Sequence, residues 1–450
     1  MVSGLEVIGF DRGLMGLSLA VHIILASLAM ALPLLMVLSE FIGIKRNDKD
    51  FTIFAKRISK PFLVFLGVGT ASGILIAINI LVLWPKFMSL VSQVAILPFN
   101  FETIAFFMES LFVAVYFFSW GKLKRKYTHV LLGIPVVIGG ALSAVFITMI
   151  NAFMNTPVGF NKALYLANGT ISNINPWAVF TSPSAANEIL HVVGTTYFMG
   201  ISIVLGYLAI RFLKTKNQKE KTYYKKIIWM LLILAAIFIV WSVITGMTSA
   251  SSVYAQQPEK FAAIEGDLHP MTYAPEIIGG FPGANGTLKD YFKIPDLQSI
   301  LAAGKPSGAV PGLSQYNPDT YPPLFIHFMF DFMVIVGTGI AFILLLIIFL
   351  RIIKKNPLSR KITSISLVVS GIFSILLVEN GWIMAESGRQ PWIIYNIMRV
   401  SQAANPSPSV IPVAIAIAAF YIFIIPLSIF ILKLIFRNKP LDKDLKSRAK

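Results

Sequence analysis

Two pairs of glutamates occur seven residues apart inside strongly apolar stretches of this sequence. Glu102 and Glu109 form one pair, and Glu379 and Glu386 form the other. Seven residues make almost two turns of an α-helix, so both members of a pair face one side, about 10 Å apart along the axis. Carboxyl groups stacked in this way are suited to relay protons or to contact a cofactor. For Glu102, a position near a solvated helix end explains the carboxylate as well.

Three more side chains in apolar stretches are able to ligate iron, namely His22, His191 and Met333. His191 and Met333 each come early in their stretch, and a histidine–methionine pair is a known way to hold a six-coordinate haem. Taken alone, His22 fits a buried, hydrogen-bonded histidine as well as it fits a ligand. Met333 is one of 16 methionines and fits ordinary core packing.

The composition determines which elements can position these groups. Hydrophobic residues make up 56% of the 450 residues, charged residues only 13%, and the mean hydropathy is +0.75. That is about half the charge of a soluble protein, so most of the chain is expected to face lipid. The absence of cysteine excludes disulfides, thiolate metal sites, iron–sulfur clusters and covalently attached haem.

Nine apolar stretches are long enough to cross a bilayer, and in lipid they must be helices to satisfy their own backbone hydrogen bonds. They lie near residues 14–43, 57–85, 98–121, 128–154, 185–213, 224–253, 323–350, 361–387 and 408–436. The sequence therefore predicts an all-α integral membrane protein with nine transmembrane helices.

The basic residues predict how these helices are oriented. The formal net charge is +17, but 29 of the 38 lysines and arginines fall on the odd-numbered connections and the C-terminal tail. This distribution argues against nucleic-acid binding, which needs a basic face on a folded domain. By the positive-inside rule it predicts an N-terminus outside and a C-terminus in the cytoplasm, which an odd number of helices satisfies.

One connection, residues 254–322, is long and is predicted to lie outside. It is rich in proline and glycine, with possible short helices near 256–266 and 295–303. A loop of this length is usually functional or disordered, and its aromatic and apolar residues favour an ordered cap on the outer face. The chain is thus divided into helices 1–6 (residues 1–253), the outer loop (254–322) and helices 7–9 (323–450).

Short motifs along the chain resemble one known family. Residues 386–392 read ESGRQPW, which resembles the GRQPW signature of cytochrome bd oxidase subunit I. Other segments agree in order: LWPKF at 83–87, AFFMES at 105–110, SAVFITMINAFMNTPVGF at 143–160, QPEKFAAIEG at 257–266 and MVIVG at 333–337. The resemblance runs through essentially the whole chain, and nine helices with the N-terminus outside also fit it.

This resemblance implies roles for residues that match the family's motifs. His191 and Met333 match the axial ligands of a low-spin haem b, and Glu386 matches the ligand of a high-spin haem b. His22 matches the ligand of the oxygen-reducing haem, usually haem d, with Glu102 at or near its opposite face. The implied cofactors are therefore two haem b and one haem d, or a third haem b.

Further matches concern the surroundings of the haems, the protons and the quinol. Trp382 lies by the haems in the family, and Arg389 belongs to the GRQPW signature. Glu109, Ser110 and Ser143 match a proposed proton path. Lys260 and Glu265, in the outer loop, match residues implicated in quinol oxidation.

The activity that the resemblance implies is oxidation of a membrane quinol outside and reduction of oxygen to water with protons from the cytoplasm. The expected location is the cell membrane. The expected partners are subunit II of the oxidase and, in some members, a small single-helix subunit.

One residue departs from the family pattern. The position two residues before the axial methionine is often arginine, and here it is Asp331. An ionised aspartate would lower the reduction potential of the haem, whereas burial would favour its neutral form. The quinone type or the electron donor is therefore open.

Two other classes of protein remain as alternatives. A proton- or ion-coupled transporter would account for Glu102, Glu109 and Glu386. It would not explain a histidine–methionine pair beside a quinol-type loop, and transporters tend to show internal repeats. A membrane scaffold that only binds a partner would leave all of these intramembrane polar residues unexplained.

Overall fold

The computed structural model describes residues 4–282, 288–438 and 440–446 of the chain. Within these residues, nine helices are long and apolar enough to cross a membrane. They are α1 (Gly4–Lys45), α2 (Lys49–Leu83), α4 (Ile96–Ser119), α5 (Lys126–Asn155), α7 (Ala185–Lys214), α8 (Gln218–Gln256), α11 (Phe325–Ile352), α12 (Lys361–Ser387) and α14 (Ile411–Asn438). All nine helices predicted from the sequence are present.

Shorter elements connect the long helices. The helical ones are α3 (Pro85–Val94), α6 (Lys162–Asn168), η1 (Pro176–Thr181), α9 (Pro258–Glu265), α10 (Leu297–Ala303), η2 (Leu313–Gln315), η3 (Pro318–Thr320), η4 (Pro357–Ser359), α13 (Val400–Ala403), η5 (Pro408–Val410) and α15 (Leu441–Lys446). Helices α9 and α10 confirm the two short helices predicted in the long loop. Residues 283–287 of that loop and the last four of the basic tail lie outside the described residues.

The expectation of an all-α chain needs a small correction. Strands β1 (Glu276–Pro282) and β2 (Leu288–Ile294) form an antiparallel hairpin in the long loop, with Glu276 paired to Ile294. Strands β3 (Trp392–Ile394) and β4 (Met398–Arg399) form a second, shorter hairpin after α12. Both lie in connections, where short strands leave no apolar periodicity long enough to detect.

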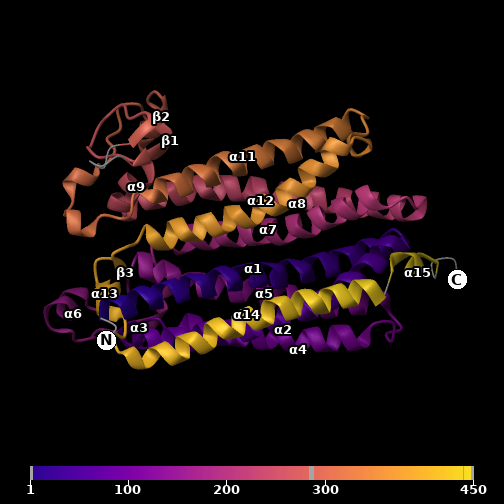
Figure 1. Cartoon of the computed structure of the whole chain (residues 1–450), viewed down its shortest axis with the longest axis horizontal. Coiled ribbons are helices and arrows are strands. Elements are labelled where there is room, and N and C mark those ends of the chain that lie inside the picture. Colours follow the sequence, from indigo (N-terminus) through magenta and orange to yellow (C-terminus); the bar gives the residue numbers. More distant parts are fainter. Residues whose placement is uncertain (1–3, 283–287, 439, 447–450) are drawn as a thin grey trace.

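The long helices form two neighbouring groups (Figure 1). Helices α7, α8, α11 and α12 make one group, and α1, α2, α4, α5 and α14 make the other; α7 joins them by packing against α1 and α5. Close approach depends on small residues. A Cβ on Gly206 would lie 3.4 Å from the Cα of Gly371, so α7 and α12 touch backbone to backbone at this point.

The two ends of the bundle differ in what they carry. One end of the bundle carries the start of α1, helices α3, α6, α9 and α13 and the β1–β2 hairpin, and the other end carries α15 (Figure 1). We refer to the first as the loop end and to the second as the basic end, since the basic connections and tail gather there. The candidate chemistry is concentrated toward the loop end.

Candidate functional site

The GRQPW turn at the end of α12 forms a buried hydrogen-bonded network. Arg389 is only 3% exposed, and its guanidinium donates to the carboxylate of Glu386 and, over 2.9 Å, to Oδ1 of Asn155. The Asn151 amide donates to the other oxygen of Glu386. Glu386 is thus held in a fixed orientation by two donors, one from its own helix end and one from α5.

This network continues to the start of α7 through residues that the sequence analysis did not identify. Asn155 donates from Nδ2 to Oε1 of Glu188 over 2.8 Å, and Gln257 donates to the backbone carbonyl of Asn155 over 3.3 Å. Asn151 and Asn155 are four residues apart near the end of an apolar helix. That spacing, together with the carboxylate of Glu188 near the start of the next apolar stretch, was the available signal.

Lys260 of the long loop joins the same region. It is 4% exposed, and its Nζ donates to the carbonyl of Ala385 over 2.9 Å, next to Glu386. Burial, and then the nearby Arg389 guanidinium, lower the pKa of Lys260 to about 8. The long loop is therefore fastened to the GRQPW turn by a lysine that is able to exist in both protonation states near neutral pH.

Glu265, at the end of α9, lies among other carboxylates. Burial raises its pKa well above the ordinary value, and the carboxylates of Glu276, Asp267 and Asp331 add to the rise. Burial also raises the pKa of Asp267 to about 6 and that of Glu276 to about 7. A carboxyl group with a raised pKa is suited to accept a proton at neutral pH.

His191 lies on α7 and Met333 on α11, and both of these helices pack against α8 and α12. Nδ1 of His191 lies 3.2 Å from Oγ1 of Thr245 on α8, which orients the imidazole. A Cβ on Gly246 would lie 3.3 Å from Cε1 of His191, and a Cβ on Gly381 would lie 3.3 Å from Sδ of Met333. Each side chain therefore occupies space that a larger residue on the facing helix would fill.

His22 shows the same arrangement in the other helix group. A Cβ on Gly73 of α2 would lie 3.2 Å from its Cε1, and Nδ1 is buried without a hydrogen-bond partner. A buried imidazole nitrogen without a partner is costly and calls for an explanation such as a bound group.

The carboxylates of α4 face α5. Ser143 donates to Oε1 of Glu102 over 2.8 Å. Glu109 is 4% exposed, and its Oε1 is buried without a hydrogen-bond partner, close to where a Cβ on Gly140 would lie. Ser110 and Trp382 are half-buried. The structure thus joins Glu102 to Ser143 directly and places Glu109 on the same helix face.

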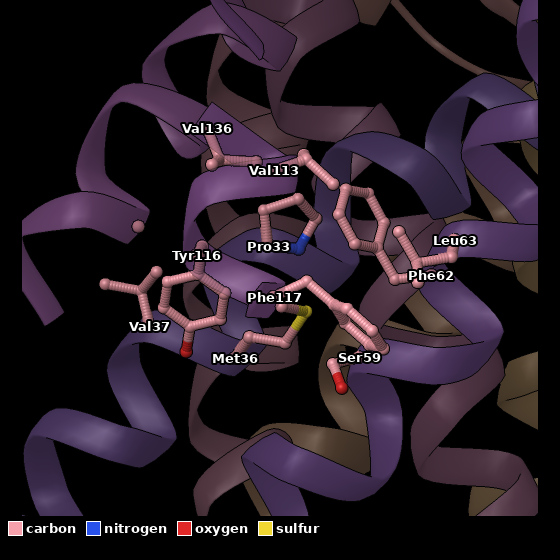
Figure 2. Close-up of a pocket in the computed structure, with 11 residues that line it drawn as sticks. Pro33, Met36, Val37, Ser59, Phe62, Leu63, Val113, Tyr116, Phe117 and Val136 are labelled. Atoms are coloured by element: carbon pink, nitrogen blue, oxygen red, sulfur yellow. The ribbon is translucent and has the colours of Figure 1, made fainter. Parts of the chain in front are cut away.

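His129 and His327, each near one end of an apolar stretch of the sequence, are both buried inside the protein. At the basic end, Nδ1 of His129 lies 2.6 Å from Oε1 of Glu40, and the Tyr116 hydroxyl donates to Oε2 of Glu40 over 2.6 Å. These contacts connect α1, α4 and α5. A pocket lies beside these contacts, and most of the side chains that line it are apolar (Figure 2). Its lining includes Val113, which lies between Glu109 and Tyr116 on α4, and the hydroxyl-bearing Tyr116 and Ser59.

We expect Tyr116→Phe to lower the free energy of unfolding by roughly 1–3 kcal/mol, because it leaves one oxygen of the buried Glu40 without its donor. Thermal unfolding in detergent would measure the change. Tyr207→Phe is the control, since Tyr207 is 39% exposed. Equal stability of the two variants would contradict the expectation.

In the described part of the chain, no group of three or more His, Cys, Asp or Glu side chains is placed to hold a metal ion. A metal held only by protein side chains is therefore not indicated there. His22, His191 and Met333 each lie beside a glycine of the facing helix, and Nδ1 of His22 has no hydrogen-bond partner. Isolated candidate ligands of this kind fit a bound group that brings most of its own metal ligands, as haem does.

Comparisons with known proteins identify the family of this chain. The family model for cytochrome bd terminal oxidase subunit I matches residues 10–440. A Bacillus subtilis protein provisionally named as a cytochrome bd menaquinol oxidase subunit I is 35% identical, over 96% of this chain and 97% of the relative. A second B. subtilis protein, cytochrome bd ubiquinol oxidase subunit 1, is 28% identical, over 89% and 86% of the two chains.

A solved structure gives the same result for the fold. The bd oxidase from Geobacillus thermodenitrificans matches with a TM-score of 0.91 and 34% identity, over 98% of this chain and 100% of that one. The agreement covers sequence and fold. This chain therefore belongs to the cytochrome bd terminal oxidase subunit I family, as a multi-pass, haem-binding membrane subunit of a quinol oxidase.

Proposed function

We propose that this chain oxidises a membrane quinol at its long loop and passes the electrons through haem b groups to a third haem, where oxygen is reduced to water. The observation that carries the proposal is the hydrogen bond from Lys260 to the carbonyl of Ala385. It joins the proposed quinol-binding loop to the helix end that bears Glu386, a proposed haem ligand, so that donor and acceptor sites are adjacent.

The proposed haem ligands follow from the residues already placed. His191 and Met333 would hold the low-spin haem b, Glu386 the high-spin haem b, and His22 the oxygen-binding haem with Glu102 at or near its other face. The third haem is proposed to be haem d, or else a third haem b. When bound, the haems supply electron transfer and the site where oxygen is reduced. Arg389 holds Glu386 in a fixed orientation for this role.

At the quinol site, Lys260 and Glu265 are proposed to handle the hydroxyl groups. The Lys260 ammonium would donate a hydrogen bond to one quinol oxygen, and the Glu265 carboxylate would take the proton from the other. Oxidation of a quinol to a quinone releases two protons and two electrons. The protons leave from the loop end through the carboxylates around Glu265, and the electrons pass to the haems.

Protons for oxygen reduction are proposed to come from the basic end. The lysines and arginines gathered there indicate that this end is cytoplasmic, so that both the N-terminus and the loop lie outside. Glu109, Ser110, Ser143 and Glu102 would form the last part of the path, with the Ser143–Glu102 hydrogen bond as its final link. Uptake inside and release outside separate charge without a pump.

Menaquinol is the proposed donor. The relative at 35% identity is provisionally named for menaquinol and the one at 28% for ubiquinol. Asp331 lies two residues before Met333, and an ionised carboxylate there would lower the reduction potential of the low-spin haem. A lower potential suits menaquinol, the lower-potential donor of the two. Subunit II is proposed as the obligatory partner, with a single-helix subunit as a possible addition.

The test is a reduced-minus-oxidised visible spectrum of the complex with subunit II, combined with pyridine haemochrome quantification and menaquinol-dependent oxygen consumption. Two b-type haems plus a red-shifted chlorin band would support haem d at the third site. Three b-type haems without that band would keep the oxidase proposal but change the third haem. A folded complex without haem would overturn the proposal in favour of a proton- or ion-coupled transporter.

We expect Gly73→Val to reduce binding of the haem held by His22. A Cβ at this position would lie 3.2 Å from Cε1 of His22, so the two additional methyl groups of valine must displace the imidazole. Pyridine haemochrome analysis should show that about one of the proposed three haems is lost.

Gly67→Val is the matched control, because it lies on the same helix and a Cβ there meets nothing within 4 Å. Equal haem content in the two variants would show that Gly73 does not make room for a ligand.

A further inference from the structure

His327, near the start of α11, is 2% exposed and makes two hydrogen bonds to backbone carbonyls. Its Nδ1 lies 2.6 Å from the carbonyl oxygen of Ile264, and its Nε2 lies 2.9 Å from that of Gly279. A carbonyl oxygen can only accept, so both ring nitrogens must carry a proton. An imidazole with two N–H groups is a cation.

The surroundings of His327 suit a cation. The Ile264 carbonyl belongs to the last turn of α9, where helix carbonyls lack intrahelical partners and the helix dipole favours positive charge. The nearest counter-charge is Asp331, four residues further along α11, with Oδ2 at 3.5 Å from Nε2. Oδ2 of Asp331 also accepts a hydrogen bond from the backbone N–H of Gly279 over 2.5 Å. His327 and Asp331 together therefore bond both the carbonyl and the N–H of Gly279.

These contacts join three elements at the proposed quinol site. His327 and Asp331 lie on α11, Ile264 precedes Glu265 on α9, and Gly279 lies on β1. Gly279 has a φ of 75°, which favours glycine. The hydrogen bonds of His327 and Asp331 therefore fix the end of α9, and with it the position of Glu265, relative to the β1–β2 hairpin and α11.

His327 interacts directly with three carboxylates: Asp267 after α9, Glu276 of β1 and Asp331 of α11. Glu265 of α9 and Lys293 of β2 interact in turn with these carboxylates. His327 acts on two of them: its positive charge opposes the burial that raises the pKa of Asp267 and of Glu276. Glu276 and Asp267 in turn raise the pKa of Glu265.

We propose that His327 is a positioning residue for quinol oxidation, a buried imidazolium that clamps α9 and the β1–β2 hairpin onto α11 and holds the carboxylates around Glu265 ready to take the quinol's proton. The proposal rests on the proposed quinol site at Lys260 and Glu265. His327 itself does not contact the quinol; it acts through the position of Glu265 and through the charge of the surrounding carboxylates.

The sign of the expected effect follows from the charges. Removing the cation with His327→Gln lets the pKa of Asp267 and Glu276 rise further, so the carboxylates stay protonated to a higher pH. Neutral neighbours no longer raise the pKa of Glu265, so the acid side of the kcat/KM profile for quinol should move downward by about half a pH unit or more. Glu276→Gln removes a carboxylate that raises the pKa of Glu265, so this variant should move the same limb downward.

The experiment measures menaquinol-dependent oxygen consumption of the complex with subunit II from acid to alkaline pH. Three variants are compared with the unaltered chain: His327→Gln, Glu276→Gln and, as control, His269→Gln. His269 lies in the same loop but is exposed, and its Nδ1 faces only the Ser314 hydroxyl, at 3.1 Å. Haem content is recorded for each variant.

Downward shifts of the acid limb for both His327→Gln and Glu276→Gln, with none for His269→Gln, would support the proposal. Loss of rate by the same factor at every pH in His327→Gln would overturn it and leave His327 a purely structural residue. If His327→Gln does not assemble with haem, Glu276→Gln decides, and an unshifted profile overturns the proposal. No quinol oxidation by the unaltered complex would instead remove the proposed function and this inference together.

Discussion

Glu265→Gln is expected to lower menaquinol-dependent oxygen consumption by about 100-fold or more, the effect of removing a positioned general base. Glutamine keeps the size of the side chain but cannot take a proton from the quinol hydroxyl. The unaltered carboxyl group is well placed for this step, because burial and the neighbouring carboxylates raise its pKa well above the usual range. It therefore binds the proton firmly once the carboxylate has accepted it.

The pH dependence of the same group has a definite sign. A carboxyl group with a raised pKa is protonated up to a higher pH, so the unaltered enzyme should lose activity as the pH falls through that raised value. The glutamine variant should lack this acid limb and show a low, nearly flat profile. A variant that keeps the acid limb unchanged would assign it to another group.

Two controls separate proton acceptance from damage to the loop. Glu259→Gln alters the same short helix, but Glu259 accepts from the Thr320 hydroxyl over 2.6 Å and does not act on the pKa of Glu265. It should therefore retain most of the activity. Chemical reduction of the haems without quinol should be equally fast in both variants. Slow chemical reduction in Glu265→Gln would mean that the haems themselves were disturbed.

Met333→Leu is expected to remove one of the two proposed ligands of the low-spin haem and to lower turnover with quinol by about 100-fold or more. Leucine has nearly the same volume as methionine, so packing alone changes little. The reduced-minus-oxidised spectrum should lose the low-spin haem b signal, either because the haem becomes high-spin or because it is no longer bound.

The matched control is Met199→Leu, because Met199 is fully buried in α7 and is not a proposed ligand. It should retain its full haem content and its spectrum. A Met333→Leu variant with an unchanged low-spin signal would refute Met333 as a ligand and direct the search to other side chains of α11 and α12.

Much of the fold could be predicted from the sequence because lipid imposes a simple rule on a spanning segment. A run of about 20 apolar residues must be helical, so each stretch could be assigned without knowledge of its neighbours. The GRQPW motif likewise identified Glu386 and Arg389 from their immediate context. The ligating roles of His22, His191, Met333 and Glu386 remain predictions that spectroscopy must test.

The contacts that organise the candidate site could not be predicted in this way. Arg389 reaches Asn155 across 234 positions in the sequence, and Lys260 reaches Ala385 across 125. The hydrogen bond from Gly279 to Asp331 spans 52 positions. No local pattern encodes such pairs, because each depends on how helices and loops pack after they have formed.

His327 illustrates the division most clearly. Its sequence context, one histidine near the start of an apolar stretch, indicated only a place near the membrane surface. Sequence alone determined that the chain has nine apolar helices, a basic end and a motif of the bd oxidase family, since these depend on residue type and local order. Only the tertiary structure decided that His327 is buried with both nitrogens on carbonyls, because its partners come from α9 and β1, which fold against α11 from elsewhere in the chain.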